Sequence, residues 1–246
     1  MLCRPTWWSS SIAATRLPDW QTPGVTEYVL TLVVRVEKGE RPGQTDALEA
    51  AGRAVLVMLA DERSVGEGEW AGAMRAWQDV RIRDARIRKV VRRGRGAEWR
   101  RAAALPGITV TWGTAVVRVF PPVPLDAVPK ELAKLQVSGT DFEDPEELPA
   151  LAPDMPVLWI NPELEMSSGK AMAQCGHGAQ LAWWALSAAG RKEWAAADFA
   201  LAVRTATPAK WKELLTSGLP VVQDAGFTEV APGSCTVVAD HPLLRR

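Results

Sequence analysis

Runs of apolar residues alternate along the chain with segments in which small and apolar residues recur at helical spacing. Each half of the chain begins with an apolar run typical of a strand, "YVLTLVVRV" or "VLWINPEL". A small-residue segment typical of a helix follows, and then a second helical segment with a Glu-Trp pair. Next come another strand ("RIRKVVRR" or "FALAVRT"), a short helix with Trp99 or Trp211, the dipeptide "LP" and a final strand. Strands that alternate with helices predict an α/β sandwich in each half.

The two halves repeat this order at an offset of 124 residues. At that offset "ALEAAGRAVLVMLA" from Ala47 lies on "AMAQCGHGAQLAWW" from Ala171, and the two Glu-Trp pairs coincide. Identity between the halves is low, so chance similarity is the alternative. The shared order of elements and the matched Trp positions favour an internal duplication.

A proline-rich acidic segment separates the halves. Residues 121–156 hold eight prolines and eight Asp or Glu residues. Because proline removes a backbone donor and restricts the residue before it, we expect a linker that runs extended over the surface, with a helical turn or two at "KELAKL". The sequence therefore predicts an N-terminal segment (1–24), a first lobe (25–120), the linker (121–156) and a second lobe (157–246).

Composition narrows the class of protein. The chain of 246 residues has no net charge, but residues 1–120 carry an excess of six positive charges and residues 121–246 an excess of six negative charges. It contains no apolar run long enough for a membrane span and no signal peptide pattern, which predicts a cytoplasmic protein with no membrane partner. Its three cysteines are far apart, so neither a disulfide framework nor a zinc site is indicated.

One predicted helix carries a polar face. Lys170, Gln174 and His177 follow at i, i+4 and i+7, so they share one side of the helix. The positions that match them in the first half are Asp46, Ala50 and Arg53. A solvated lysine and a core histidine would be the ordinary interpretation, but the loss of the whole set from the other half favours chemistry.

The start of this helix is a candidate anion site. Ser167 or Ser168 is expected to cap it, and Gly169 follows with backbone N–H groups that we expect to be free. Two glycines within the helix, Gly176 and Gly178, each cost roughly 1 kcal/mol relative to alanine, so another backbone or a ligand is expected to approach closely. Gly176 has a counterpart in Gly52.

Two motifs of the second lobe resemble a known family. "MSSGKAMAQCGHGAQLA" and "GLPVVQDAGFTEVAPGSCTVVADHP" are similar to the two signatures of the type 2 peptidyl-tRNA hydrolases. The resemblance covers nearly all of residues 157–246, in the family's order. It implies a mixed four-stranded sheet with helices on both faces. With the repeat, it predicts two similar three-layer lobes that form a pseudo-dimer.

The resemblance also implies an activity. The family cleaves the ester that joins a peptide to the 3′ end of tRNA, without a metal or organic cofactor. Carried over by position, its polar site comprises Lys170, Gln174, His177, Asp224 and Thr228, with Ser234 at a hydroxyl position.

We expect Asp224 to position water, directly or through His177, while Lys170 pairs with a phosphate or stabilises the oxyanion. Thr228, Ser234 and Gln174 are expected to hold the acyl group and the 3′ ribose. Singly, Asp224 and Thr228 would be ordinary turn residues.

Two further features bear on this site. Cys175 and His177 are two residues apart and point in different directions on a helix, so they cannot form a nucleophilic pair, and a buried thiol is expected. Phe227 stands where the family commonly has Arg, which weakens the expected contact with a phosphate.

A basic run in the first half suits a polyanion. It could form a track for tRNA, in which we single out Arg88 and Arg92 as substrate-binding residues, or it could be a charged edge strand that discourages pairing with other sheets. The run comprises Arg81, Arg83, Arg86, Arg88, Lys89, Arg92, Arg93 and Arg95.

Three functions compete on this sequence. A peptidyl-tRNA esterase is favoured because the full polar set stands in one lobe. The alternatives are a noncatalytic RNA-binding or scaffold protein that keeps the fold, and a hydrolase of another acyl-tRNA. In each case the protein is expected to be a monomer with an internal pseudo-dimer, held by an apolar lobe interface, or a homodimer.

Overall fold

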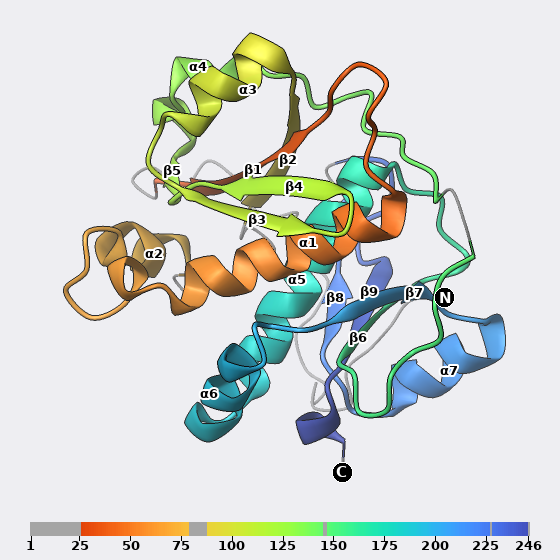
Figure 1. Cartoon of the computed structure of the whole chain (residues 1–246). Coiled ribbons are helices and arrows are strands. Elements are labelled where there is room, and N and C mark those ends of the chain that lie inside the picture. The colour runs from red at the N-terminus through yellow and green to blue at the C-terminus, as the bar shows by residue number, and fades with distance from the viewer. Residues whose placement is uncertain (1–25, 79–87, 145–146, 227, 246) are drawn as a thin grey trace, which may run out of the picture.

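The computed structural model describes residues 26–78, 88–144, 147–226 and 228–245, and it confirms an α/β protein with two mixed sheets and helices packed against them (Figure 1). The predicted N-terminal segment 1–24 therefore lies outside the described residues. The first sheet contains β1 (Tyr28–Arg35), β2 (Arg88–Gly94), β3 (Ile108–Trp112), β4 (Ala115–Val119) and β5 (Val123–Pro124). The second sheet contains β6 (Val157–Ile160), β7 (Ala202–Thr205), β8 (Val221–Gln223) and β9 (Cys235–Asp240). Below, the N-terminal half is everything before β6 and the C-terminal half is everything from β6 onward.

The two sheets share one topology. The first has the order β2-β1-β4-β3 and the second the order β7-β6-β9-β8. In each, the first two strands in the chain pair in parallel (β1 with β2, β6 with β7), and the third and fourth pair in antiparallel fashion (β3 with β4, β8 with β9). The first sheet departs from the four strands expected, because β5 adds a short antiparallel pairing to β1.

Helices form the remaining layers. α1 and α5 lie between the two sheets and begin at the offset of 124 residues found in the sequence, while α3 and α4 cover the outer face of the first sheet and α7 that of the second (Figure 1). No described helix is long and apolar enough to cross a membrane. The bounds are α1 (Gln44–Ala60), α2 (Ala71–Trp77), α3 (Gly96–Ala103), α4 (Lys130–Ala133), α5 (Ser168–Ala185), α6 (Ala188–Ala196) and α7 (Pro208–Thr216), with 3-10 turns η1 (Glu62–Ser64), η3 (Leu125–Ala127) and η4 (Pro242–Leu244).

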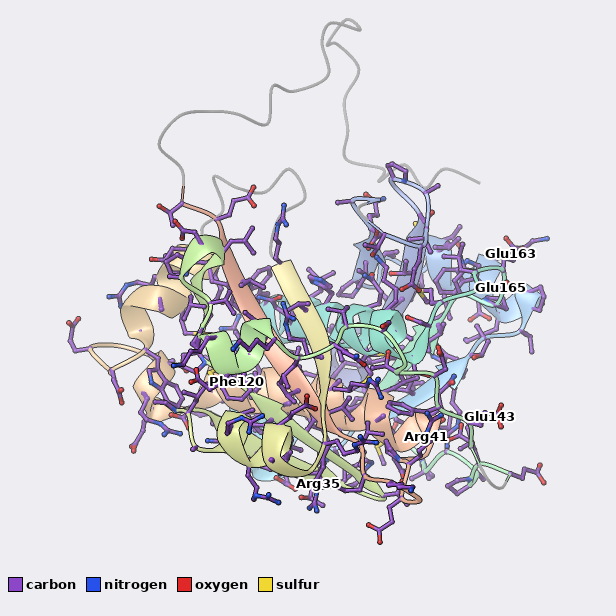
Figure 2. All side chains as sticks on the ribbon, turned by 90° about the horizontal axis from the view of Figure 1, so that it is seen from above. Arg35, Arg41, Phe120, Glu143, Glu163 and Glu165 are labelled. Atoms are coloured by element: carbon purple, nitrogen blue, oxygen red, sulfur yellow. The ribbon has the colours of Figure 1, made fainter. Side chains whose placement is uncertain are left out.

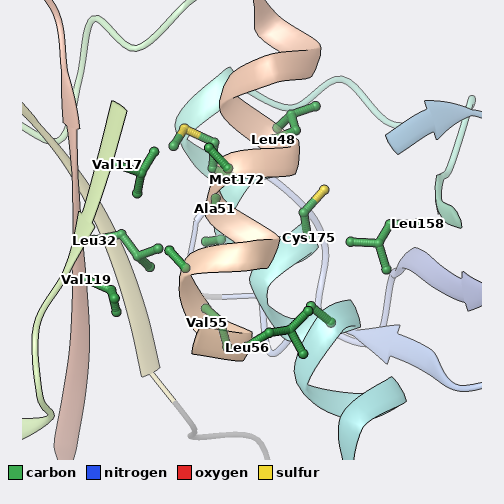
Figure 3. Close-up of a cluster of buried hydrophobic side chains, with 14 of the residues drawn as sticks. Leu32, Leu48, Ala51, Val55, Leu56, Val117, Val119, Leu158, Met172 and Cys175 are labelled. Atoms are coloured by element: carbon green, nitrogen blue, oxygen red, sulfur yellow. The ribbon is translucent and has the colours of Figure 1, made fainter. Parts of the chain in front are cut away.

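The largest hydrophobic core is shared by both halves. Successive residues of a strand point to opposite faces, so Leu32 of β1 faces the central helices while Val33 packs on the outer layer. Figure 3 shows Leu32 on one side of α1 and α5, Leu158 on the other, and Met172 between the sheets. Fully burying each such side chain contributes about 1.5–3 kcal/mol. The apolar surface predicted between the two halves is therefore present.

The segment 121–156 is more than a surface linker. Its Leu132, Leu135 and Phe142 are almost fully buried, the first two in the outer core of the first sheet and the third in the central core. The helical turn expected at "KELAKL" is present as α4 (Lys130–Ala133). The expected surface path is wrong at Phe142, because this apolar side chain packs into the central core.

The same segment crosses the start of α1. There the Arg41 guanidinium donates to the backbone carbonyl oxygen of Asp141 (3.3 Å), and the backbone N–H of Gln44 donates to the backbone carbonyl oxygen of Glu143 (3.3 Å). Figure 2 shows Arg41 and Glu143 at this crossing. Asp144 then caps the helix, since both the amide and the hydroxyl of Thr45 donate to its carboxylate at 2.8 Å. The linker thus fastens the first turn of α1.

Candidate active site

Helix α5 brings the predicted polar residues together. Ser167 is its N-cap, and the Ser167 hydroxyl accepts a hydrogen bond from the backbone N–H of Lys170 (3.2 Å). Gln174 and His177 follow on the face that Lys170 begins, as their spacing predicts, and all three side chains line one cavity.

The expected anion site at the start of α5 is wrong. The backbone N–H of Gly169 donates to the Thr140 hydroxyl at 3.1 Å, so it is not free for a ligand. A Cβ on Gly169 would lie 2.4 Å from that hydroxyl oxygen. The Ser168 hydroxyl in turn accepts from the backbone N–H of Phe142 (2.9 Å). Gly169 still lines the cavity, but its backbone N–H is already hydrogen-bonded to Thr140 of the 121–156 segment.

Lys170 and Asp224 form a nearly buried ion pair. Their Nζ and Oδ2 atoms lie 2.6 Å apart, and the side chains are 9% and 10% exposed. The Gln174 amide donates to the same carboxylate oxygen at 2.9 Å. Lys170 also reaches the Thr228 hydroxyl at 3.4 Å. Four of the predicted site residues are therefore joined in one chain of contacts.

The loop after β8 holds Asp224 in place. The other carboxylate oxygen of Asp224, Oδ1, accepts from the backbone N–H of Gly226 at 2.8 Å, and Gly226 has a positive φ of 77°. The Asp224 backbone exchanges two hydrogen bonds with the far side of the loop, to the Ser234 carbonyl (2.9 Å) and from the Gly233 N–H (2.7 Å). Ser234 thus contributes backbone to the loop. It is not among the described residues that line the cavity, so its predicted place beside the substrate is not supported.

Thr236 was missed by the sequence analysis. Its hydroxyl donates to Gln174 Oε1 at 2.6 Å, and the residue has no exposed surface. This bond fixes the orientation of the Gln174 amide, so that Nε2 is the atom directed at Asp224. Thr236 lies near the start of β9, two residues after Ser234, which precedes that strand. A hydroxyl residue at the start of the predicted final strand was the signal available in the sequence.

His177 has a different partner from the one expected. Among the described residues no hydrogen bond joins it to Asp224. Its Nδ1 instead lies 2.9 Å from the Nζ of Lys89, which comes from β2 in the N-terminal half. Burial, followed by the positive charges of Lys89 and Lys170, lowers the pKa of His177 well below its usual value. The imidazole is therefore neutral at neutral pH.

A cavity of about 1060 Å³ connects these groups. It lies between α5, β2 and the loop after β8, and the 121–156 segment supplies apolar lining through Leu125, Val128 and Val137. The polar lining comprises Lys170, Gln174, His177, Asp224 and Thr228 together with Arg88, Lys89 and Arg92. Both halves of the chain therefore build one cavity.

Three residues of the basic run, Arg88, Lys89 and Arg92, lie at this cavity. β2 is an edge strand of the first sheet, as one interpretation of the run predicted, and its Arg88 and Arg92 also line the cavity. Arg92 donates to the carbonyl oxygens of Ala133 (3.1 Å) and Leu135 (2.7 Å), and burial lowers its pKa. Arg81, Arg83 and Arg86 lie outside the described residues, as does Phe227.

Cys175 takes no part in the site. It is fully buried in the central core, and burial raises the pKa of its thiol. This confirms a small hydrophobe rather than a nucleophile. Among the described residues, no three His, Cys, Asp or Glu side chains are grouped so that they could hold a metal ion.

In the N-terminal half, the position that matches His177 is filled by a buried arginine. Arg53, at the position that matches His177, is buried and pairs with Asp198 of the C-terminal half at 2.5 Å. Its guanidinium also stacks over the Trp112 ring, 4.0 Å from the centroid. Arg53 thus packs between the two halves, whereas His177, at the matching position of the C-terminal half, lines the cavity.

The first half also lacks the loop of Asp224. Asp46, which matches Lys170, accepts hydrogen bonds from the backbone N–H and the hydroxyl of Thr114, each 2.7 Å long. Thr114 lies in the tight turn between β3 and β4, which stands where the C-terminal half has its long loop. The N-terminal half therefore has no counterpart of the loop that carries Asp224 and Thr228.

Comparison with known proteins identifies the C-terminal half. Residues 155–245 match the family model described as "Peptidyl-tRNA hydrolase PTH2", so this part of the chain is a PTH2 family domain. The resemblance found in the two sequence motifs is confirmed. No curated protein and no solved structure matches the chain.

Proposed function

We propose that the C-terminal half hydrolyses the ester bond between a peptide and the 3′ end of tRNA, releasing the peptide and free tRNA. One observation carries the proposal: the nearly buried ion pair of Lys170 and Asp224, 2.6 Å apart, lines a cavity in a PTH2 family domain. His177, whose pKa is lowered well below its usual value, lines the same cavity, and a perturbed titratable group in a cavity favours a catalytic site over a purely structural one.

The reaction needs stabilisation of a developing charge. The oxygen of water bonds to the ester carbonyl carbon, and the carbonyl oxygen becomes an oxyanion. The bond to the ribose oxygen then breaks, and that oxygen receives the proton released by the water. We assign the Lys170 ammonium to the oxyanion, because a preorganised cation in a partly dry cavity stabilises such a charge strongly.

Asp224 is assigned to the attacking water. Its Oδ2 already accepts from Lys170 and Gln174, whereas Oδ1 accepts only from Gly226 among the described residues. Oδ1 is thus the oxygen with room for a proton of the water. Gln174 is engaged at both ends of its amide, so we assign it to positioning Asp224 rather than to holding substrate.

The tRNA is proposed to enter past β2. Arg88 and Arg92 line the same cavity and would meet phosphates near the 3′ end, with Thr228 close to the ester. Contacts between cationic side chains and phosphates weaken as the salt concentration rises, so the affinity for tRNA should fall steeply with ionic strength.

The test is ester cleavage of an N-blocked aminoacyl-tRNA. We expect the wild-type protein to turn the substrate over, and Asp224→Asn to lower kcat by roughly 100-fold or more, by analogy with the loss of one polar group at other oxyanion sites. Asp126→Asn, a change at an exposed aspartate of η3, is the matched control and should leave kcat unchanged.

The other two functions predict different results. Binding of the tRNA without turnover would favour a noncatalytic RNA-binding protein. Cleavage of an unblocked aminoacyl-tRNA in preference to the blocked one would favour a hydrolase of another acyl-tRNA. The loss of the site loop from the N-terminal half gives neither alternative an advantage, because the site of the C-terminal half keeps its full polar set.

The N-terminal half is inferred to be a degenerate copy that takes the place of a second subunit. Identical strand order in the two sheets and the matched starts of α1 and α5 support a duplication. A shared core supports the pseudo-dimer. Light scattering should then give the mass of one chain, 26.8 kDa, and a mass of two chains would point to the homodimer.

A further inference from the structure

Lys89 crosses from one half of the chain into the site of the other. It shares a face of β2 with the buried Val91, and that face packs on α5. Gly176 makes room for it, since a Cβ there would lie 3.3 Å from Lys89 Cδ. Because Gly176 has no side chain, the methylene groups of Lys89 can pass close to α5.

The Lys89 ammonium group ends among three partners. Its Nζ lies 2.9 Å from His177 Nδ1 and 2.5 Å from Gln180 Oε1, and it stands 4.9 Å from the centroid of the Trp77 ring. Burial lowers the pKa of Lys89 well below its usual value. Among the described residues no carboxylate pairs with it.

A buried lysine that has no acidic partner among the described residues is costly to the fold, so packing alone is a poor reason for its presence. Its contacts point to His177 instead. Gln180 Oε1 has no proton, so Lys89 donates there, and as an ammonium its Nζ has no lone pair and can only donate to Nδ1 as well. A ring nitrogen that accepts carries no proton, which places the single proton of a neutral imidazole on Nε2.

We propose that Lys89 is a positioning residue for His177, which it holds as the tautomer with the proton on Nε2, so that the active site is completed by the N-terminal half. The nitrogen left for the cavity is then a donor, suited to the water or to the ribose oxygen that leaves. The catalytic part of this inference rests on the proposed hydrolase function. The tautomer itself does not.

The test reads the ring nitrogens of His177 directly. The chain has two histidines, His177 and His241, so ¹⁵N-labelled imidazoles give a spectrum with two spin systems. In the wild type we expect Nδ1 of His177 to show the shift of an unprotonated nitrogen and Nε2 that of a protonated one. The opposite pattern, or an even mixture, overturns the proposal whatever the enzyme activity.

Variants of Lys89 extend the test. Lys89→Met removes the donor at similar length, and we expect the His177 ring to lose its fixed tautomer and its pKa to rise. Lys89→Arg keeps a donor and should retain more of the wild-type pattern. Lys192→Met, at an exposed lysine of α6, is the matched control and should change neither signal. His241 serves as the internal reference.

The direction of the pKa change follows from the charges around His177. Lys89 faces it from β2 and Lys170 from its own helix, and both disfavour a second positive charge, while Asp224 lines the same cavity from the loop after β8. Removing Lys89 takes away one of the two repulsive charges. A His177 pKa and tautomer that stay unchanged in a folded Lys89→Met protein would contradict the proposal.

Activity separates this inference from the proposed function. If the protein is a hydrolase, Lys89→Met should lower kcat about tenfold or more with a smaller change in KM, because proton transfer rather than binding is affected. If the wild type shows no turnover, the proposed function fails while the nitrogen signals still decide the role of Lys89. An active Lys89→Met protein with wild-type kcat overturns the catalytic part of the inference.

Discussion

Gly52 of α1 and Gly176 of α5 stand 124 positions apart in the chain, and each faces the other half. A Cβ on Gly52 would lie 3.2 Å from Leu201, and one on Gly176 would lie 3.0 Å from Val55. Both glycines therefore mark places where the two halves approach closely along the central helices, as their matched positions in the sequence predicted.

We expect Gly176→Leu to destabilise the protein by about 1–3 kcal/mol or more, because the added side chain must displace Val55 and the stem of Lys89. Urea unfolding gives the change in free energy. Gly72→Leu is the control, since this exposed glycine of α2 has open space where its Cβ would be. The control should be neutral or stabilising by up to about 1 kcal/mol. Equal effects of the two changes would contradict the close approach.

Much of this site was predictable because it is local. The spacing of Lys170, Gln174 and His177 follows from helical geometry, and a helix keeps that geometry whatever packs around it. The comparison of the two halves also separated packing glycines from chemical groups, since Gly52 persists where the polar set does not.

What the sequence could not supply lies far apart in the chain. Thr140 takes the N–H of Gly169 from a segment that proline and acidic residues made to look like a solvated linker. Lys89 reaches His177 across 88 positions, from a run that reads as a phosphate track. The pattern of a single sequence does not show which distant segments lie side by side. It therefore cannot predict a hydrogen bond between such segments.

The Lys170–Asp224 pair should behave as one unit in stability. Replacing one member leaves the other charge buried without its partner, and we expect Lys170→Met or Asp224→Asn to destabilise the protein by about 3 kcal/mol each. The double variant should lose much less than the sum of the two, because neither charge is then stranded.

A double-mutant cycle on unfolding free energies measures this coupling. Lys210 and Glu213 on α7 provide the control pair, with side chains 35% and 68% exposed. Their cycle, with Lys210→Met and Glu213→Gln, should give no more than about 0.5 kcal/mol. Additive losses at Lys170 and Asp224 would be inconsistent with a buried ion pair.

Thr236→Val is expected to lower both stability and activity without creating a cavity in the core. Valine has nearly the same shape as threonine, but it cannot donate to Gln174 Oε1, and an unsatisfied buried acceptor costs about 1–3 kcal/mol. The Gln174 amide then loses the bond that keeps Nε2 on Asp224, so kcat/KM should fall as well. Thr216→Val, at an exposed threonine of α7, should change stability by less than about 0.5 kcal/mol. A Thr236→Val protein with wild-type stability and activity would remove Thr236 from the site.

His241 should make the protein less stable in acid. Burial and, to a smaller extent, the positive charge of Arg245 lower the pKa of His241 from 6.5 to about 4, while the negative charge of Asp240 acts in the opposite direction. In the folded protein its Nδ1 accepts from the backbone N–H of Leu243 (3.2 Å), and the Trp194 ring packs against it, 4.7 Å between centroids. The unfolded chain therefore binds a proton below pH 6.5 that the folded chain refuses until about pH 4.

Stability consequently falls as the pH drops from 6.5 toward 4, and it levels for this group below the folded pKa. Unfolding free energies measured across that range should show a steeper decline in the wild type than in His241→Asn, whose amide oxygen can still accept from Leu243 but does not titrate. His177, with its own lowered pKa, adds a decline of the same sign that both proteins share. Parallel pH profiles for the two proteins would mean that His241 is protonated as readily in the folded chain as in the unfolded one, and that the packing of Trp194 and η4 around it leaves the ring open to water.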